Sequence, residues 1–400
     1  MTRRLLFVVL LQCAAACTPA EPPLPTVQAP EPAAPDARAP EAGDAGLWQA
    51  STRSPEPSEA QGLAARLGAL CARQEGALDR VATRLAARGD AALEPAELGF
   101  ELRVAGSPHV WPRSWSYAGS ALDPEDALSR AKRWLAGFGD GGKRSCGAAH
   151  VKGNGQEAVF LVAVDALADL NGVPVRARPG QWLDVSARML VDARGAKVIV
   201  LGPRGAPRAI PTSLDAGVVR ARFAPSSPGA WLLQVLADVD KGPRPVLEAL
   251  VHADSAPPGA FHSAPAPGEE AGAALTDPAS ALFAMVNAAR RAEGAGALTR
   301  NSELERAALV HAEAMRDTRS LGHDVGKGSV KSRLAELGLE PSAYGENVAR
   351  AATAERAHRA IWASPSHRGN LLEPRYDSVG IAAVVGPDGV WVTEVFADLR

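Results

Sequence analysis

The chain has 400 residues and a formal net charge of −2, a length for which we expect two or three compact units. Its sequence contains no long basic run and no basic stripe interleaved with aromatic residues, so nucleic acid is not an expected partner. Aromatic residues make up only 5% of the chain, which indicates small-residue helices and linkers rather than one large aromatic core.

The first 17 residues have the pattern of a secretion signal. Arg3 and Arg4 precede the apolar run from Leu5 to Leu11, and a box of small residues ends at Cys17. This arrangement resembles a bacterial lipoprotein signal, in which the cysteine is acylated and anchors the mature protein to a membrane. The apolar run is too short to span a bilayer. We therefore expect an extracytoplasmic, membrane-anchored lipoprotein of the cell envelope, with ordinary signal cleavage and a secreted form as the alternative.

Residues 18–60 are dominated by Pro, Ala and Glu, a composition that buries too little apolar surface to offset the entropy of ordering. This composition predicts a disordered, partly polyproline tether. Beyond Cys17, only Cys71 and Cys146 remain in the mature chain. Outside the cytoplasm the two predict a disulfide, and two separate buried thiols are the alternative.

Three further segments precede the last domain. Residues 61–170 combine helical periodicity with later strand-like runs, which predicts an α+β domain. Residues 173–254 alternate with period two between turn segments, which predicts a small antiparallel β-sandwich resembling an immunoglobulin-like module. Residues 255–276 are rich in Pro, Gly and Ala and predict a linker.

Residues 277–400 predict helices followed by an antiparallel hairpin, again an α+β unit. Asp277 is an N-cap with proline after it, and Asn301 caps the next helix. Two alternating strands, over residues 378–385 and 390–397, are joined by a Gly-Pro-Asp-Gly turn.

Several motifs occur in order along this last segment. They are Asn287 with Arg291, Ala308-x-x-His311-Ala312-x-x-Met315, a lone His323, Gly345-Glu346-Asn347-Val348-Ala349, Trp362 with Ser364-Pro365-Ser366-His367-Arg368-x-Asn370-Leu371-Leu372, Val379-Gly380-Ile381-Ala382, and Trp391-Val392-Thr393-Glu394-Val395-Phe396-Ala397. Together they resemble a bacterial SCP-like domain of the CAP superfamily, which groups cysteine-rich secretory proteins, antigen 5 and pathogenesis-related proteins. The resemblance implies an α-β-α sandwich at the C-terminus of a lipoprotein.

The resemblance also implies a surface cleft lined by two histidines and acidic residues. By motif, His323 matches the first histidine, Glu346 the glutamate and His367 the second histidine. A second family glutamate has no counterpart, because Ser364 and Pro365 stand in that region. Two imidazoles and a carboxylate suit zinc or another divalent metal, or general acid–base chemistry near neutral pH. Purely structural hydrogen bonding by His367 and Glu346 is the alternative.

A segment before the predicted β-sandwich has a motif order similar to that of the last domain. Tyr117, the segment around Trp134 and Cys146-Gly147-Ala148-Ala149 follow in the order of Tyr344, Trp362 and Val379-Gly380-Ile381-Ala382. This order predicts a degenerate CAP-like copy without counterparts of Glu346 and His367. Convergence of two alanine-rich α+β blocks is the alternative.

These observations favour a binding protein over an enzyme. The cleft would take a lipid, a peptide, a cell-wall fragment or a metal at the envelope. A metal- or His/Glu-assisted hydrolase is the second hypothesis. The third is a scaffold that binds an envelope protein and keeps only a vestigial cleft.

Overall fold

The computed structural model describes residues 47–400 except 90–92, 138–141, 154 and 241. The chain divides into two units, residues 1–41 and 42–400, and the following description concerns the second. The predicted signal peptide, Cys17 and most of the predicted tether lie outside the described residues. Within the described part of the chain, no helix is both long enough and apolar enough to cross a membrane.

The ordered chain begins earlier than the predicted end of the tether at residue 60. Strand β1 (Ser51–Thr52) pairs antiparallel with β7 (Val173–Pro174). Trp48 is buried, and its Nε1–H donates a hydrogen bond to the carbonyl oxygen of Pro258 at 3.0 Å. This large aromatic ring supplies apolar surface that the surrounding Pro/Ala-rich sequence lacks. The prediction of a tether up to residue 60 was therefore too long at its C-terminal end.

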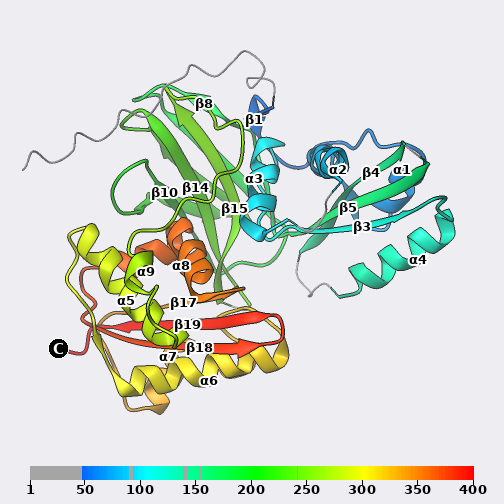
Figure 1. The fold of residues 1–400 in the computed structure, drawn as a ribbon. Coiled ribbons are helices and arrows are strands. Elements are labelled where there is room, and N and C mark those ends of the chain that lie inside the picture. Colours follow the sequence, from blue (N-terminus) through cyan, green and yellow to red (C-terminus); the bar gives the residue numbers. More distant parts are fainter. Residues whose placement is uncertain (1–46, 90–92, 138–141, 154, 241) are drawn as a thin grey trace, which may run out of the picture. The chain divides into compact units, whose positions relative to one another are not determined.

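The N-terminal domain is a three-layer unit with one sheet between two helical layers (Figure 1). Its elements in chain order are α1 (Gly62–Gly68), β2 (Arg73–Gln74), α2 (Gly76–Arg88), α3 (Pro95–Val104), β3 (Arg113–Gly119), α4 (Pro124–Leu135), β4 (Lys143–Gly153) and β5 (Gln156–Ala166). The sheet order is β2-β4-β5-β3. Helices α1 and α4 share an apolar core with one face of this sheet, and α2 and α3 share a second core with the other face.

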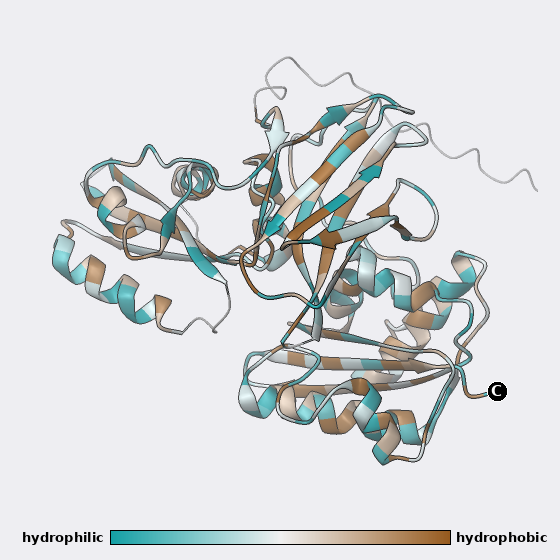
Figure 2. Cartoon of the chain, turned by 180° about the vertical axis from the view of Figure 1, so that it is seen from behind, coloured by the Kyte–Doolittle hydropathy of each residue, from teal (hydrophilic) through white to brown (hydrophobic). Residues whose placement is uncertain are grey.

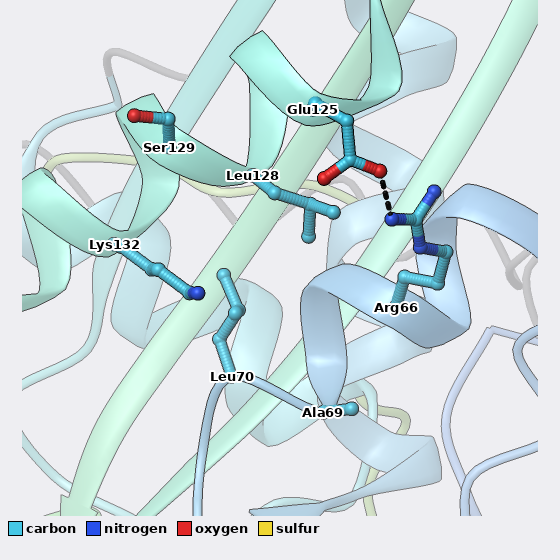
Figure 3. Close-up of a pocket in the computed structure, with 7 residues that line it drawn as sticks. All are labelled: Arg66, Ala69, Leu70, Glu125, Leu128, Ser129 and Lys132. Atoms are coloured by element: carbon cyan, nitrogen blue, oxygen red, sulfur yellow. Dashed lines mark hydrogen bonds and ion pairs between the residues drawn. The ribbon is translucent and has the colours of Figure 1, made fainter.

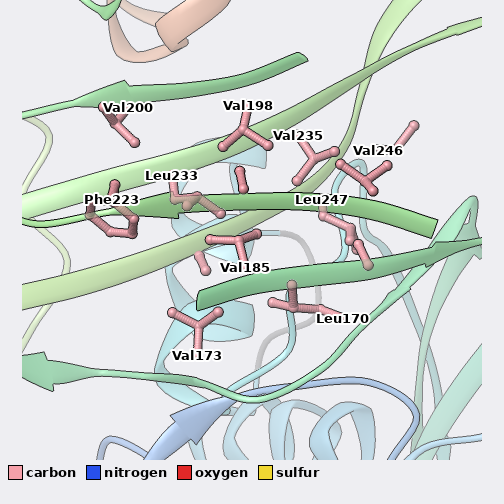
Figure 4. Packing of buried hydrophobic residues seen from close by; sticks show 14 of the residues in the cluster. Leu170, Val173, Val185, Val198, Val200, Phe223, Leu233, Val235, Val246 and Leu247 are labelled. Carbon is pink, nitrogen blue, oxygen red and sulfur yellow. The ribbon is translucent and has the colours of Figure 1, made fainter. Parts of the chain in front are cut away.

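The middle domain is a β-sandwich of two sheets, ordered β11-β10-β14-β15-β8 and β12-β13-β9-β6. Its strands are β6 (Ala168–Leu170), β8 (Arg176–Ala177), β9 (Leu183–Met189), β10 (Gly195–Leu201), β11 (Arg208–Ile210), β12 (Thr212–Asp215), β13 (Val218–Phe223), β14 (Gly229–Val239) and β15 (Gly242–Ala253). One apolar cluster fills the space between the sheets (Figure 4). The sandwich starts at β6, a few residues before the predicted boundary, because Ala168 and Leu170 are buried in this cluster.

Hydrophobic and hydrophilic residues alternate along the sandwich strands (Figure 2). In β13 the alternation runs from Val218 to Phe223, with Val219, Ala221 and Phe223 buried. Because successive side chains of a strand point to opposite faces, this pattern gives each sheet one core face and one solvent face.

The C-terminal domain repeats the three-layer arrangement with its own sheet. Its elements are α5 (Pro278–Ala292), β16 (Thr299–Arg300), α6 (Ser302–Thr318), α7 (Val330–Glu336), β17 (Tyr344–Ala351), α8 (Ala354–Ala363), α9 (Pro365–Leu372), β18 (Ser378–Gly386) and β19 (Gly389–Ala397). The sheet order is β16-β18-β19-β17. Figure 1 shows α6 on one side of this sheet and α5, α8 and α9 on the other. The predicted α+β class, with an α-β-α sandwich at the C-terminus, is confirmed.

Caps fix the starts of the helices in this domain. The Asp277 carboxylate accepts from the N–H of Ser280, and Asn301 Oδ1 accepts from the N–H groups of Glu303 and Leu304. Such side chains satisfy N–H groups that have no partner within the first turn of a helix. The starts of α5 and α6, which carry much of the core, therefore agree with the sequence-based prediction.

The N-terminal and C-terminal sheets have the same topology. In each sheet a two-residue strand pairs in parallel with the third strand of the domain in chain order, as β2 with β4 and β16 with β18. That third strand then pairs antiparallel with the fourth, and the fourth pairs antiparallel with the second, giving β4-β5-β3 and β18-β19-β17. The two domains differ in their last helical segment, because α9 has no counterpart among the described residues between α4 and β4.

Candidate functional site

The predicted site begins at Glu346 in β17. The preceding Gly345 has no room for a side chain, since a Cβ there would lie 2.6 Å from the Tyr376 hydroxyl and 2.9 Å from Asn370 Oδ1. Asn370 in turn donates to the Glu346 carbonyl oxygen at 3.0 Å. The Gly-Glu-Asn sequence therefore packs tightly against α9 and holds the Glu346 backbone in place.

The Glu346 carboxylate is buried and has cationic or N–H partners on both oxygens. His323 Nδ1–H donates to Oε1 at 2.9 Å, and the Arg333 guanidinium contacts Oε2. Burial opposes ionisation of this carboxyl, but the His323 hydrogen bond and the Arg333 charge outweigh it. The pKa of Glu346 is consequently lowered, and the side chain is a carboxylate at neutral pH.

Arg333 in α7 was not predicted from the sequence. Besides Glu346, its guanidinium donates to the carbonyl oxygens of His323 at 3.1 Å and Gly328 at 2.6 Å. Arg333 thus fixes both the carboxylate and the loop that carries His323. A single arginine beside Leu334 on a short helix gives no sequence signal that distinguishes it from a surface charge.

His323 is the most exposed member of the group, with 24% of its side-chain surface accessible to solvent. Because Nδ1–H donates a hydrogen bond to Glu346, Nε2 is the ring nitrogen left to accept one. His311 in α6 lies behind the pair, with Nε2 3.9 Å from Glu346 Oε1. Its Nε2–H donates to the Gly322 carbonyl oxygen at 2.8 Å, and burial lowers the pKa of His311, which keeps this ring neutral.

His367 lies in α9 and is half-buried. Burial, with a contribution from nearby His323, lowers the pKa of His367 to about 3, so its imidazole is also neutral at pH 7. Its carbonyl oxygen accepts from Asn347 Nδ2 at 3.2 Å. The structure thus places His323 and Glu346 in direct contact, and His367 lies within electrostatic range of His323.

Glu394 in β19 is a buried carboxyl that the sequence analysis did not single out as a site residue. Its Oε2 accepts from Asn347 Nδ2 at 3.0 Å, and Oε1 has no hydrogen-bond partner. Burial raises the pKa of Glu394 to about 7, against the opposing effect of the Asn347 hydrogen bond. An acidic residue inside an otherwise apolar strand was the sequence signal that could have identified it.

We tested whether the predicted metal ligands His323, Glu346 and His367 fit a divalent cation. In the described part of the chain, no group of three or more His, Cys, Asp or Glu side chains is arranged to hold a metal ion. Moreover, Arg333 contacts one Glu346 oxygen, so a cation bound there would lie beside a buried guanidinium. The donor set does not fit a divalent metal in this geometry, and we derive no metal-dependent step.

The sandwich contacts the chain next to His367. The N–H of Ser366 donates to Gln234 Oε1 at 3.1 Å, and Gln234 Nε2 lies 3.5 Å from the Ser364 hydroxyl. Gln234 itself is fully buried in β14. The start of α9, and with it the backbone before His367, is therefore held from outside the C-terminal domain.

Away from this site, the sulfur atoms of Cys71 and Cys146 are bonded to each other. The bridge links the chain after α1 to the start of β4, and the two cysteines are separated by 75 positions in sequence. Closing a loop of this length restricts the unfolded chain and so stabilises the folded one.

The family comparison matches the C-terminal domain. Residues 283–396 match the model of the cysteine-rich secretory protein family, CAP. The C-terminal domain is a CAP domain. The predicted resemblance of this segment to the CAP superfamily is thereby confirmed.

Solved structures similar to the chain include three bacterial surface or secreted proteins. An outer surface protein of Borrelia burgdorferi has 18% identity and a TM-score of 0.29, covering 31% of this chain and 93% of its own. An extracellular SCP-domain protein of Bacillus anthracis has 15% identity and a TM-score of 0.28, with coverages of 58% and 86%. A cysteine-rich secretory protein of Staphylococcus aureus has 11% identity and a TM-score of 0.26, with coverages of 67% and 91%. A search of curated protein sequences found no match.

Proposed function

We propose that this CAP-domain protein is a lipid-anchored binding protein of the cell envelope, and that its CAP domain binds a neutral, polar ligand at His323 and His367. The observation that supports this proposal is the hydrogen bond from His323 to the buried, Arg333-paired Glu346. It fixes the orientation of a partly exposed imidazole whose second nitrogen is left to accept a hydrogen bond.

The charge state of the site favours an uncharged ligand group. The Arg333 cation and the Glu346 carboxylate offset each other, and His367 and His311 are kept neutral by burial. Neutral imidazoles can donate hydrogen bonds to hydroxyl and amide groups and accept hydrogen bonds from them. They carry no net charge that would attract a phosphate or a carboxylate. Of the ligand classes expected from the sequence, this property favours a cell-wall fragment, which carries sugar hydroxyls and peptide amides.

A calorimetric titration of the full chain with soluble disaccharide-peptide fragments of peptidoglycan tests this proposal. We expect saturable binding that weakens at least roughly ten-fold in His323→Gln, because a lost hydrogen bond to a buried group costs about 1–3 kcal/mol. His262→Gln is the matched control, since His262 is exposed and lies in the linker before the CAP domain. Phosphatidylglycerol vesicles form the second arm. Binding to vesicles alone, or equal binding by both variants, would contradict the proposal.

A hydrolase is the second candidate, supported by the same dyad. A carboxylate that holds Nδ1–H of a histidine leaves Nε2 able to take a proton from water, as in general-base catalysis. The Ser366 hydroxyl is hydrogen-bonded to the Ser364 hydroxyl at 3.2 Å and not to His323. Release of new reducing ends or free amines from peptidoglycan, abolished by His323→Gln, would support this second function over simple binding.

A further inference from the structure

Corresponding hydrogen bonds and close contacts set the two three-layer domains in one register. The N–H of Glu75 donates to the carbonyl oxygen of Cys146 at 2.9 Å. Likewise, the N–H of Asn301 donates to the carbonyl oxygen of Val379 at 3.1 Å. One residue further along the strand, Gly147 and Gly380 each meet the first turn of a helix. A Cβ on Gly147 would lie 2.1 Å from Asp79 N, and one on Gly380 would lie 2.2 Å from Glu305 N. These contacts make α2 equivalent to α6 and β4 equivalent to β18.

The same register shows what the N-terminal domain lacks. Gly380 pairs with Val395, which pairs with Glu346, whereas Gly147 pairs with Val162, which pairs with Ser114. Ser114 therefore stands at the position of Glu346. With no helix equivalent to α9 among the described residues, a counterpart of His367 is missing there as well. The N-terminal domain thus has the scaffold without the histidine site, and a different surface of this domain forms a pocket.

That surface lies between α1 and α4. A pocket of about 450 Å³ is lined there by Arg66, Ala69, Leu70, Glu125, Leu128, Ser129 and Lys132, which we call the α1–α4 groove (Figure 3). Leu70 and Leu128 supply its apolar part, and Arg66 and Lys132 supply two cations. Arg66 is already paired with Glu125, but both side chains are at least half exposed, so this surface pair is easily exchanged for another carboxylate.

The equivalent surface of the CAP domain is occupied by the chain's own linker. Aligning the N-caps Asp123 of α4 and Thr353 of α8 makes Leu128 equivalent to His358 and Ser129 to Arg359. His358 Nε2–H donates to the Pro267 carbonyl oxygen at 2.9 Å.

Arg359 holds both oxygens of Glu269, each at 2.6 Å, and Glu269 is buried. Between them, Gly268 has φ +88° and lies against α5, where a Cβ would be 2.5 Å from the Met285 carbonyl oxygen. Residues 265–269 have the pattern Pro-x-Pro-x-Glu. They cover the surface between α5 and α8, where Arg359 holds the carboxylate of their glutamate.

The N-terminal domain has a segment of the same pattern that takes another path. Residues 55–59 also read Pro-x-Pro-x-Glu. They lie on α2, where the Glu56 carbonyl oxygen accepts from the N–H of Gly76 at 3.0 Å and Ser58 Oγ–H donates to Asp79 at 2.5 Å. The described chain therefore leaves the α1–α4 groove open, although its sister surface is filled.

We propose that residues 61–166 are a degenerate second copy of the CAP fold and that its α1–α4 groove binds an extended Pro-x-Pro-x-Glu peptide of a partner protein. The glutamate of such a peptide pairs with Lys132 and Arg66, and its proline or alanine residues pack on Leu70 and Leu128. The occupant is an acidic peptide because the groove offers two cations beside an apolar floor and because the sister surface holds a carboxylate of this kind.

Fluorescence anisotropy of a labelled peptide with the sequence of residues 264–273, titrated with the full chain, tests the proposal. We expect saturable binding that weakens roughly ten-fold or more in the Arg66→Glu/Lys132→Glu variant. Lys143→Glu, an exposed charge reversal in the same domain, is the matched control and should bind normally. A peptide with lysine in place of the first glutamate should not bind.

Two outcomes overturn the proposal. One is the absence of saturable binding by the folded chain, with folding verified by circular dichroism for each variant. The other is binding that survives in the Arg66→Glu/Lys132→Glu variant but is lost in Arg359→Glu, which would show exchange with the linker on the CAP domain instead. Because His323 lies outside the groove, His323→Gln should leave peptide binding unchanged, which separates this test from that of the proposed function.

Discussion

Arg333 and Glu346 form an ion pair in which only 3% and 1% of the two side-chain surfaces are exposed. Arg333 is the residue that holds the carboxylate behind His323, and it also hydrogen-bonds the backbone of the His323 loop. The orientation of His323 therefore depends on an arginine on a neighbouring helix, and the first prediction concerns this pair.

Arg333→Met should destabilise the chain by about 3–5 kcal/mol, because it leaves a buried carboxylate without its counter-charge. Adding Glu346→Gln should restore most of that loss, since the double variant has no buried charge at this position. Urea unfolding of the single variant, the double variant and the wild type measures both effects. A single variant that loses less than about 1 kcal/mol would show that the pair is not buried in solution.

His367→Gln should change how stability depends on acid. The pKa of His367 in the folded chain is lowered to about 3 from 6.5, so the unfolded chain binds a proton at this residue first as the pH falls. The wild type should therefore lose stability between pH 6.5 and pH 4 relative to the variant, by up to about 3 kcal/mol. The difference in melting temperature between the two proteins across this range measures it. Parallel pH profiles would contradict the assignment of a half-buried, neutral His367.

Glu394→Gln should have the opposite pH dependence. The pKa of Glu394 is raised to about 7 from 4.5, so the folded chain retains a proton that the unfolded chain has released. Wild-type stability should fall as the pH rises from 4.5 through 7, and the glutamine variant should be more stable at pH 8 by up to about 3 kcal/mol. Near pH 4 the wild type and the glutamine variant should have the same free energy of unfolding. Chemical denaturation at pH 4, 6 and 8 gives the comparison.

Gly147→Ala and Gly380→Ala should both be strongly destabilising, by about 3 kcal/mol or more, because a helix backbone occupies the position of the new methyl group. Gly153→Ala is the control, as a Cβ there meets nothing within 4 Å. Thermal unfolding of the three variants should show two large losses and one small change. A well-tolerated Gly147→Ala would argue against equivalent helix packing in the two domains.

The elements with strong local signals agree with predictions from the sequence. Asp277 and Asn301 both cap helices, and the Gly-Pro-Asp-Gly turn joins β18 to β19. His323, Glu346 and His367 were assigned to a cleft through the family resemblance of their motifs, and this assignment stays a prediction. Local composition and spacing determine the helix caps and the hairpin turn, so these features are available without a structure.

Two features that depend on long-range contacts, the Arg333–Glu346 pair and the burial of Trp48, were not predicted. Arg333 is 13 residues from Glu346 in the chain, and neither its helix nor its neighbours show that it is buried. Trp48 lies in a Pro/Ala-rich segment, and only its packing against Val104 and Val175 shows that the fold has already begun.

The alignment predicted between the N-terminal domain and the CAP domain is correct for one segment and wrong for two aromatic residues. The segment around Gly147 does correspond in register to that around Gly380, as the sequence suggested. Tyr117, however, pairs with Val159 at the level where Ala349 pairs with Val392, so it is not equivalent to Tyr344. The N-cap alignment likewise places Lys132, and not Trp134, at the position of Trp362. Aromatic spacing misled the comparison because the backbone register is set by the glycine–helix contact and not by aromatic residues.

The proposed function depends on His323, and ring ¹⁵N NMR of the full chain at pH 7 tests it most directly. The account predicts that His323 carries its proton on Nδ1, donated to Glu346, and that its bare Nε2 resonance shifts on addition of peptidoglycan disaccharide-peptides while the His262 resonances stay in place. A proton on Nε2 in the free protein, or a His323 resonance unmoved at saturating fragment, would contradict it.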